Sequence, residues 1–238
     1  MRATGITVIG FAALLAAGAA PAAGRWSGFI AATTDYVYRG VSQTHGHPAL
    51  QGDLHYEAAG GTYLGTWVSN VHPADGTDST LEFDLYLGHS WLLSDDWRAR
   101  LTAVHYEYLD TPWQGPKDYD ELVGSVTLRD RLTASVAWAP NTWRYSVADG
   151  PARRAATSYE MTGRQPVGRG WYLSGGAGYY DLSSFGEGGY WFWNAGLGFG
   201  RSHYQVDLSY FGLDAPDWAF LYNGAESADW ALTVTWKF

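Results

Sequence analysis

The connections between the strand-like segments of this chain alternate, without exception, between short and long. Clusters of Gly, Pro, Asp and Asn, which break strands, separate twelve segments in which apolar and polar residues alternate with period 2. These segments are residues 26–38, 49–57, 62–70, 80–91, 97–109, 119–128, 132–138, 157–165, 171–180, 190–199, 203–210 and 230–238. The short connections are residues 58–61, 93–96, 129–131, 166–170 and 200–202, and the long ones are residues 39–48, 71–79, 110–118, 139–156, 181–189 and 211–229.

This alternation puts every long loop at one end of the sheet, because successive antiparallel strands reverse direction. A soluble β-sandwich has no reason for that arrangement, whereas an outer-membrane barrel has short periplasmic turns and longer extracellular loops. A helical span needs about 20 consecutive apolar residues, and none occurs after the N-terminal region. We therefore predict an all-β transmembrane antiparallel up-and-down β-barrel of about 12 strands, with both termini in the periplasm.

Several segments have one apolar face and one charged face. In residues 80–91, leucines alternate with Glu82 and Asp84, and residues 203–210 alternate in the same way around Asp207. Charged side chains facing lipid are destabilising, so they are expected to face a polar lumen and to bias ion passage. The predicted pore-lining residues are Asp53, Glu57, Glu82, Asp84, Arg98, Arg100, Glu121, Glu160, Arg164, Asp207 and Lys237. The alternative is a paired internal network that fills a narrow barrel.

Aromatic residues gather at the segment ends, where their rings would lie at the two membrane–water boundaries. The group next to the short turns is Trp26, Trp91, Trp97, Trp171, Tyr204, Trp236 and Phe238. The group next to the long loops is Tyr36, Tyr106, Tyr119, Tyr159, Trp191, Tyr210 and Trp230. Within residues 97–109 the alternation blurs beyond Ala103, which would be explained by a bulge there.

The last segment, WALTVTWKF, has an apolar face that ends in the aromatic residue Phe238. This pattern is typical of the closing strand of an outer-membrane barrel. We expect residues 230–238 to pair with the first strand and to be the part of the chain that engages the barrel-assembly machinery.

The N-terminal region has the three parts of a secretory signal peptide. Arg2 precedes an apolar run over residues 6–17, and Ala20 and Ala22 follow at the −3 and −1 positions. We predict a signal peptide at residues 1–22 and a barrel at residues 23–238. Cleavage would remove one of 15 basic residues and none of 24 acidic ones, which leaves a net charge of −10. This acidic balance argues against nucleic-acid binding, and the absence of Cys excludes disulfides.

Four stretches resemble a known family. TDYVYRGVSQT (34–44), PALQG (48–52), GTWVSNV (65–71) and EFDLYLGH (82–89) are similar to the TorF family of predicted porins, also catalogued as a Gram-negative family of unknown function. The matching motif residues are Asp35, Tyr36, Arg39, Gly40, Ser42, Gln43, Pro48, Gln51, Gly52, Trp67, Ser69 and Asn70. The resemblance implies an outer-membrane channel-like barrel and supplies neither a substrate nor catalytic residues.

Asp35 and Arg39 bracket the motif DYVYRG within the first of these stretches, at the top of the first strand. Residues four apart do not share a strand face, so a direct ion pair would need a turn or bulge near Gly40. We expect the two residues to fix the first loop to the barrel wall. The alternative is that they begin the mouth of the pore.

The sequence carries no zinc pattern, P-loop, GxSxG elbow or dinucleotide fingerprint. No motif distinguishes one of His45, His47, His72, His89, His105 and His203 as a catalytic base. We therefore predict a passive outer-membrane channel for small hydrophilic solutes or ions, with no catalytic residue, cofactor or metal, in contact with outer-membrane lipid. Alternatives are a lumen-plugged structural or adhesive barrel, a lipid hydrolase and a soluble periplasmic β-sandwich, and association into a homo-oligomer is left undecided.

Overall fold

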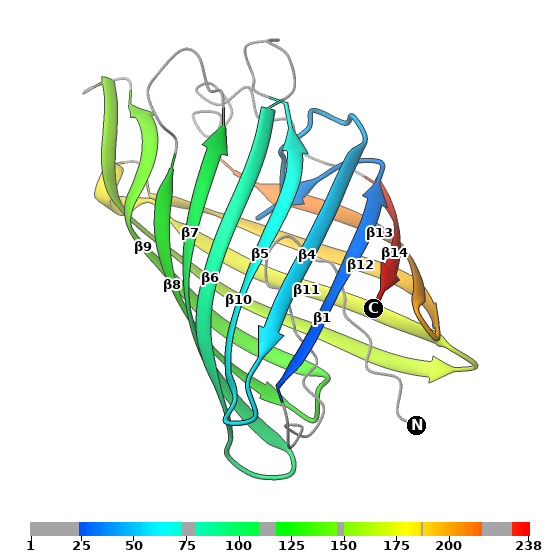
Figure 1. Cartoon of the computed structure of the whole chain (residues 1–238). Helices are drawn as coiled ribbons and strands as arrows, with labels where there is room; N and C mark the ends of the chain where they lie inside the picture. Colours follow the sequence, from blue (N-terminus) through cyan, green and yellow to red (C-terminus); the bar gives the residue numbers. More distant parts are fainter. Residues whose placement is uncertain (1–23, 73–79, 110–117, 147–149, 187, 216–229) are drawn as a thin grey trace.

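The protein folds into a closed antiparallel β-barrel of twelve strands (Figure 1). The computed structural model describes residues 24–72, 80–109, 118–146, 150–186, 188–215 and 230–238. The predicted signal peptide lies outside these residues. Each wall strand pairs with its neighbours along the chain, and the last pairs with the first. The predicted fold class is therefore confirmed, and the soluble sandwich is wrong because it would not close.

The wall strands are β1 (Arg25–Thr33), β4 (Ala49–Glu57), β5 (Thr62–Val71), β6 (Thr80–Leu92), β7 (Trp97–Leu109), β8 (Tyr119–Leu128), β9 (Leu132–Ser146), β10 (Gly150–Gly168), β11 (Trp171–Asp181), β12 (Gly189–Arg201), β13 (Tyr204–Asp214) and β14 (Trp230–Lys237). A small hairpin, β2 (Val37–Tyr38) and β3 (Val41–Ser42), follows β1, and the 3-10 helix η1 (Ser183–Phe185) precedes β12. Among the described residues, no helix has the length and apolarity needed to cross a membrane.

Closure of the barrel depends on the final strand, as predicted. β14 pairs with β1 in antiparallel register, with Lys237 opposite Phe29 and Thr233 opposite Thr33. Gly28 and Phe238 exchange two backbone hydrogen bonds of 3.1 Å each. Because these bonds satisfy the edges of the first and last strands, the sheet has no free edge where they meet.

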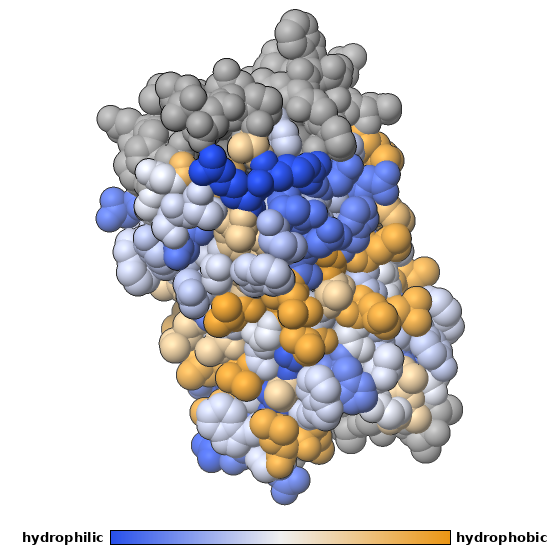
Figure 2. Space-filling view, turned by 90° about the vertical axis from the view of Figure 1, so that its left-hand side faces the viewer, coloured by the Kyte–Doolittle hydropathy of each residue, from blue (hydrophilic) through white to orange (hydrophobic). Residues whose placement is uncertain are grey.

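The outer surface of the wall is apolar and the inner surface is polar. On β6, Leu81, Leu85 and Leu87 are exposed on the outside, whereas Glu82 and Asp84 are buried inside. Figure 2 shows hydrophobic side chains gathered over the middle and lower part of one side, below a strongly hydrophilic zone. The exposed leucines, valines and tryptophans of the wall strands make up the kind of surface that a lipid environment covers.

The aromatic girdle next to the short turns is present on this outer surface. All seven predicted members are exposed: Trp26, Trp91, Trp97, Trp171, Tyr204, Trp236 and Phe238. At the other end Tyr159, Trp191 and Trp230 are exposed, but the assignment of Tyr36, Tyr106 and Tyr119 to that girdle is wrong. Tyr106 and Tyr119 share the inward face of their strands, and Tyr36 follows the end of β1. All three are buried in the lumen.

Several strands are longer than predicted, β9 and β10 most of all. The predicted loop over residues 139–156 is mostly strand, because β9 and β10 continue as a paired hairpin in which Ser146 lies opposite Gly150. Outside the bilayer an outward-facing residue has no need to be apolar, so the alternation that marks a membrane strand disappears there. The bulge expected near Ala103 is absent, since β7 keeps an unbroken register with both neighbours. Register shifts occur instead in β10, between Arg154 and Ala156 and between Pro166 and Gly168.

The largest departure from expectation follows β1. The predicted first strand, residues 26–38, ends in the structure at Thr33. From there the chain leaves the wall as residues 34–48, hereafter the inserted segment. Residues 35–44 are buried or half-buried inside the barrel, and the chain returns to the surface at residues 46–48. The hairpin β2–β3 is part of this segment (Figure 1, blue).

Candidate functional site: the barrel lumen

The predicted pore-lining residues all lie on the inward face of their strands. They are Asp53 and Glu57 on β4, Glu82 and Asp84 on β6, Arg98 and Arg100 on β7, Glu121 on β8, Glu160 and Arg164 on β10, Asp207 on β13 and Lys237 on β14. Each is buried or half-buried and occupies the same face as the buried residues of its strand. That they line a conducting pore stays a prediction.

The inserted segment spans the lumen from one wall to the other. The ring of Tyr36 packs on Trp67 of β5 with 5.3 Å between centroids. Val37 packs with Phe211 of β13 and Ala231 of β14 on another side of the barrel. Side chains from strands this far apart in the sheet can contact one short segment only from inside the barrel.

A two-residue hairpin turn carries Arg39 to the centre of the lumen. Arg39 and Gly40 connect β2 to β3 with φ angles of 49° and 80°. Two consecutive positive φ values are typical of a tight hairpin turn and favour Gly at the second position. Gly40 is also required sterically, because a Cβ there would lie 2.8 Å from the Cβ of Phe192.

The Arg39 guanidinium is held by two carboxylates and two aromatic rings. Its Nη1 lies 2.8 Å from Oε1 of Glu121, and its Nε donates a hydrogen bond of 3.4 Å to Oε1 of Glu160. The Arg39 side chain is 4% exposed and that of Glu121 is 2% exposed. The guanidinium carbon lies 4.6 Å from the centroid of Tyr38 and 4.8 Å from that of Tyr180. Arg39 therefore ties the inserted segment to β8, β10 and β11.

Asp35 acts within the inserted segment and does not pair with Arg39. Its Oδ1 accepts hydrogen bonds from the hydroxyls of Ser42, at 2.5 Å, and Thr44, at 2.8 Å. The Thr44 hydroxyl also accepts a 3.0 Å bond from the backbone N–H of Tyr36. These contacts close the base of the hairpin, so Asp35 shapes the segment that Arg39 anchors.

Other motif residues form the base on which the inserted segment sits. Asn70 accepts a 2.7 Å hydrogen bond from the backbone N–H of Leu50 and donates a 3.1 Å bond to the carbonyl of Pro48. Gln51 donates a 3.5 Å bond to Ser69 on the inward face. The motif residues named from the sequence thus come together around one feature, the entry of residues 34–48 into the lumen.

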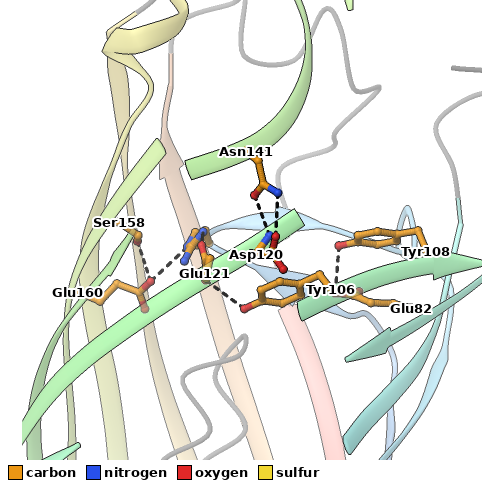
Figure 3. Close-up of polar contacts among 9 residues, drawn as sticks. Glu82, Tyr106, Tyr108, Asp120, Glu121, Asn141, Ser158 and Glu160 are labelled. Carbon is orange, nitrogen blue, oxygen red and sulfur yellow. Dashed lines mark hydrogen bonds and ion pairs between the residues drawn. The ribbon is translucent and has the colours of Figure 1, made fainter. Parts of the chain in front are cut away.

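Beside the segment lies a group of acidic and tyrosine side chains (Figure 3). Tyr108 donates a 3.0 Å hydrogen bond to Glu82, and Tyr106 donates a 3.1 Å bond to Glu121. Asp84 is fully buried on the same inward face of β6 as Glu82. A cavity of about 20 Å³ on another side of the segment touches Arg39, Gly40 and Glu160, and has the size of a single water site.

The end of the lumen next to the short turns has a different network. Tyr172 and Gln205 both hydrogen-bond to Asp207, and Lys237 donates a 2.5 Å bond to Gln205. The guanidinium of Arg164 lies 3.3 Å from the centroid of Tyr172. The predicted pore-lining residues Arg164, Asp207 and Lys237 thus have partners inside the lumen, which is the arrangement that the alternative of a filled barrel predicts.

On the neighbouring strands β1 and β4, three residues lie in contact that the sequence analysis did not connect: Ser27, His55 and Asp53. Nε2 of His55 lies 2.8 Å from the hydroxyl of Ser27, and Nδ1 of His55 lies 2.7 Å from Oδ1 of Asp53. Tyr86 donates a 2.6 Å bond to the other Asp53 oxygen. Ser27 stands opposite His55 in the β1–β4 register. The contact between them therefore becomes visible only when the register of these two strands is known. Among the other histidines of the described residues, His105 contacts the Asp120 carboxylate, His89 the Thr62 hydroxyl and His203 the backbone carbonyl of Lys237. None of these three contacts joins a hydroxyl and a carboxylate through one imidazole ring.

No three His, Cys, Asp or Glu side chains of the described residues are placed to hold a metal ion. The acidic residues Asp75 and Asp78 of the second long loop lie outside the described residues. The predictions of no metal and no cofactor therefore stay predictions.

A family model now places the chain. The model of Gcw_chp, described as a bacterial protein of unknown function, matches residues 16–238. The chain belongs to the Gcw_chp family. Membership of Gcw_chp agrees with the sequence resemblance to a family of unknown function, while the TorF name stays a prediction. No curated protein matches the Gcw_chp chain by sequence.

Solved structures share the fold of this Gcw_chp protein. The KdgM porin is 8% identical with a TM-score of 0.54, and the comparison covers 89% of this chain and 98% of the porin. The NanC porin is 10% identical with a TM-score of 0.55, and the comparison covers 87% and 97% of the two chains. At these identities the similarity shows a porin-like barrel fold and nothing about the solute.

Proposed function

We propose that this Gcw_chp protein is an outer-membrane, porin-like channel for small hydrophilic solutes or ions, in which the inserted segment sets the closed state. One observation carries the proposal: Arg39 holds residues 34–48 across the lumen of a closed barrel whose outer surface is apolar. An apolar belt with aromatic residues at its edges requires lipid. A polar lumen crossed by a separately anchored segment is suited to gated diffusion.

The proposed mechanism contains no chemical step. Solutes diffuse when the inserted segment leaves the lumen centre, and inward charges bias which ions enter. At the level of the segment the carboxylates Glu82, Asp84, Glu121 and Glu160 outnumber the single guanidinium of Arg39. We therefore expect a preference for cations. The signal peptide, engagement of the assembly machinery by β14 and homo-oligomer formation are further parts of this proposal.

A disulfide that locks the inserted segment tests the gate. The chain has no Cys, and Val37 and Ala231 belong to one buried cluster with Phe211, so Val37→Cys with Ala231→Cys is the pair chosen for a single engineered crosslink. In planar bilayers the oxidised double variant should conduct rarely, and reduction should restore the steps of the wild type. Each single-Cys variant is the control. Steps that are unchanged by oxidation, once the crosslink is verified by mass, contradict the gate.

Conductance itself tests the channel. Wild-type protein refolded into lipid should show discrete steps above baseline in molar salt. If neither the wild type nor a variant with a weakened inserted segment conducts, while both retain heat-modifiable migration in gels, the barrel is plugged and the channel proposal is wrong.

A second candidate, a serine hydrolase, is favoured by the Ser27–His55–Asp53 chain alone. Its atoms are joined in the order nucleophile, base and orienter, at 2.8 Å and 2.7 Å. However, the neighbouring Gly28 N–H already donates to Phe238, and Ser27 pairs with His55 within the sheet. We therefore interpret Ser27, His55 and Asp53 as a hydrogen-bond network of the lumen in preference to an active site.

A fluorophosphonate probe separates these two interpretations. An activated serine would be labelled at Ser27, and the label would disappear in His55→Gln while the barrel remained heat-modifiable. Absence of the label in the folded wild type rules out the hydrolase.

A further inference from the structure

The inward face of β6 carries two buried carboxyl groups, Glu82 and Asp84, and no ion pair joins either of them to a cationic side chain of the described residues. Asp84 is 0% exposed and Glu82 is 1% exposed. Neither carboxylate oxygen of Asp84 has a hydrogen-bond partner among the described residues, and Oε2 of Glu82 has none either. Burying an ionised carboxylate without a partner is costly, so such a group signals a missing ligand or proton.

The other charged groups around Asp84 are also acidic. The charged groups that act on Asp84 are Glu82 and Glu121, which have the same sign. Glu121 is already paired with Arg39, which also contacts Glu160. Four carboxylates therefore share one guanidinium at this level of the lumen, and the two on β6 are the ones left without it.

The groups around Asp84 select the kind of ligand that could neutralise it. Trp67 and Tyr106 stand directly opposite Asp84 on the two neighbouring strands, and both are buried. The Tyr108 hydroxyl reaches Glu82. Carboxylate and hydroxyl oxygens suit hard cations, and aromatic rings attract positive charge. Nitrogen or sulfur ligands for a transition metal are not present among these groups.

The number of ligands favours a single positive charge. Ca²⁺ takes 6 to 8 oxygen ligands, whereas no three suitable side chains of the described residues meet in a metal-like cluster. Two carboxylates that flank aromatic rings are better matched to a weakly coordinated monovalent ion that keeps part of its water shell.

We propose that Glu82 and Asp84 bind a monovalent inorganic cation, such as K⁺ or Na⁺, beside the inserted segment. The site deepens the proposed function, on which it rests, because it would lie in the path of permeating ions. It also connects the ion to the gate, since Tyr36 of the inserted segment packs on Trp67, which stands opposite Asp84. Cation occupancy would then stabilise the segment in its docked position.

Equilibrium unfolding by urea in phosphatidylcholine vesicles tests the site without requiring conductance. Wild-type protein is compared in KCl and in N-methyl-D-glucamine chloride at equal ionic strength, because the bulky organic cation cannot enter a buried site. At a K⁺ concentration ten times the Kd, the unfolding equilibrium constant should fall about elevenfold. Asp84→Asn should lose this response. Equal unfolding of the wild type in both salts overturns the proposal and indicates that the carboxyls carry protons.

Asp207→Asn is the matched control. Asp207 is also a buried, inward-facing aspartate, but Tyr172 and Gln205 already donate to it, so this variant should keep the K⁺ response. If Asp84→Asn does not fold, a crystal of the wild type in RbCl should give an anomalous peak between Glu82 and Asp84, and its absence refutes the site. A barrel that binds the ion but never conducts would contradict the channel and leave the cation site standing.

Discussion

Replacing Arg39 by Gln is the most direct perturbation of the lumen. The substitution keeps a hydrogen-bonding group on a shorter side chain and removes the charge that Glu121 faces at 2.8 Å. It also removes the cation that lies against Tyr38 and Tyr180. Because Glu121 stays buried on β8, it is left as an uncompensated charge while the inserted segment remains docked.

The size of the effect follows from that burial. Removing one partner of a buried ion pair costs about 3–5 kcal/mol, and each 1.4 kcal/mol or so is a factor of ten in an equilibrium constant. The equilibrium between the docked and the undocked segment should therefore shift toward the undocked state by about 10²–10⁴-fold. The wall strands keep their pairing, so the barrel itself should remain folded.

Single-channel recording in planar bilayers measures this shift as an increase in open probability. Arg129→Gln is the control, because the same substitution there removes an exposed ion pair with Asp96 on a short turn and should leave the open probability unchanged. An Arg39→Gln barrel that remains heat-modifiable and opens no more often than the wild type refutes the role given to Arg39.

Two further substitutions test the seat of the inserted segment and the lipid-facing wall. Gly40→Ala should raise the open probability, since the new Cβ would lie 2.8 Å from the Cβ of Phe192, whereas Gly46→Ala has the same positive φ but no atom within 4 Å and should raise it less. Equal open probabilities for the two alanine variants would contradict the proposed steric role of Gly40. Leu85→Arg on the exposed outer face of β6 should lower the free energy of unfolding in vesicles by about 2–4 kcal/mol. Leu93→Arg in a short turn should change it much less, and a similar loss at both positions would show that the outer face is not in contact with lipid.

The sequence predicted the wall of the barrel well because the wall is governed by local rules. Period-2 alternation and the short turns located all twelve strands, and the bounds of β4, β7 and β8 are the predicted ones. The alternation failed where bilayer contact ended. Along β9 and β10 beyond the membrane, paired strands carry polar residues on both faces, so residues 139–156 resembled a loop.

The contents of the lumen could be predicted only in part. Alternation assigned Glu82, Glu121 and Glu160 to the inward face, because period 2 fixes the face of each residue relative to its neighbours. It could not show that they meet Arg39, since these residues lie on different strands and are joined only when the sheet closes.

By itself, the sequence determined the class of fold, the strand count, the lipid-facing side and the location of the family motif. The tertiary structure decided what that motif does. Arg39 ties residues 34–48 to the wall, as expected, but it does so from inside the lumen. The sequence could not show this, because an alternating segment looks the same whether it continues up the wall or turns inside after Thr33. The choice depends on whether distant strands offer a partner for the guanidinium. Glu121 and Glu160 provide it only in the closed barrel, where burial makes an unpaired charge costly and a paired one a firm anchor.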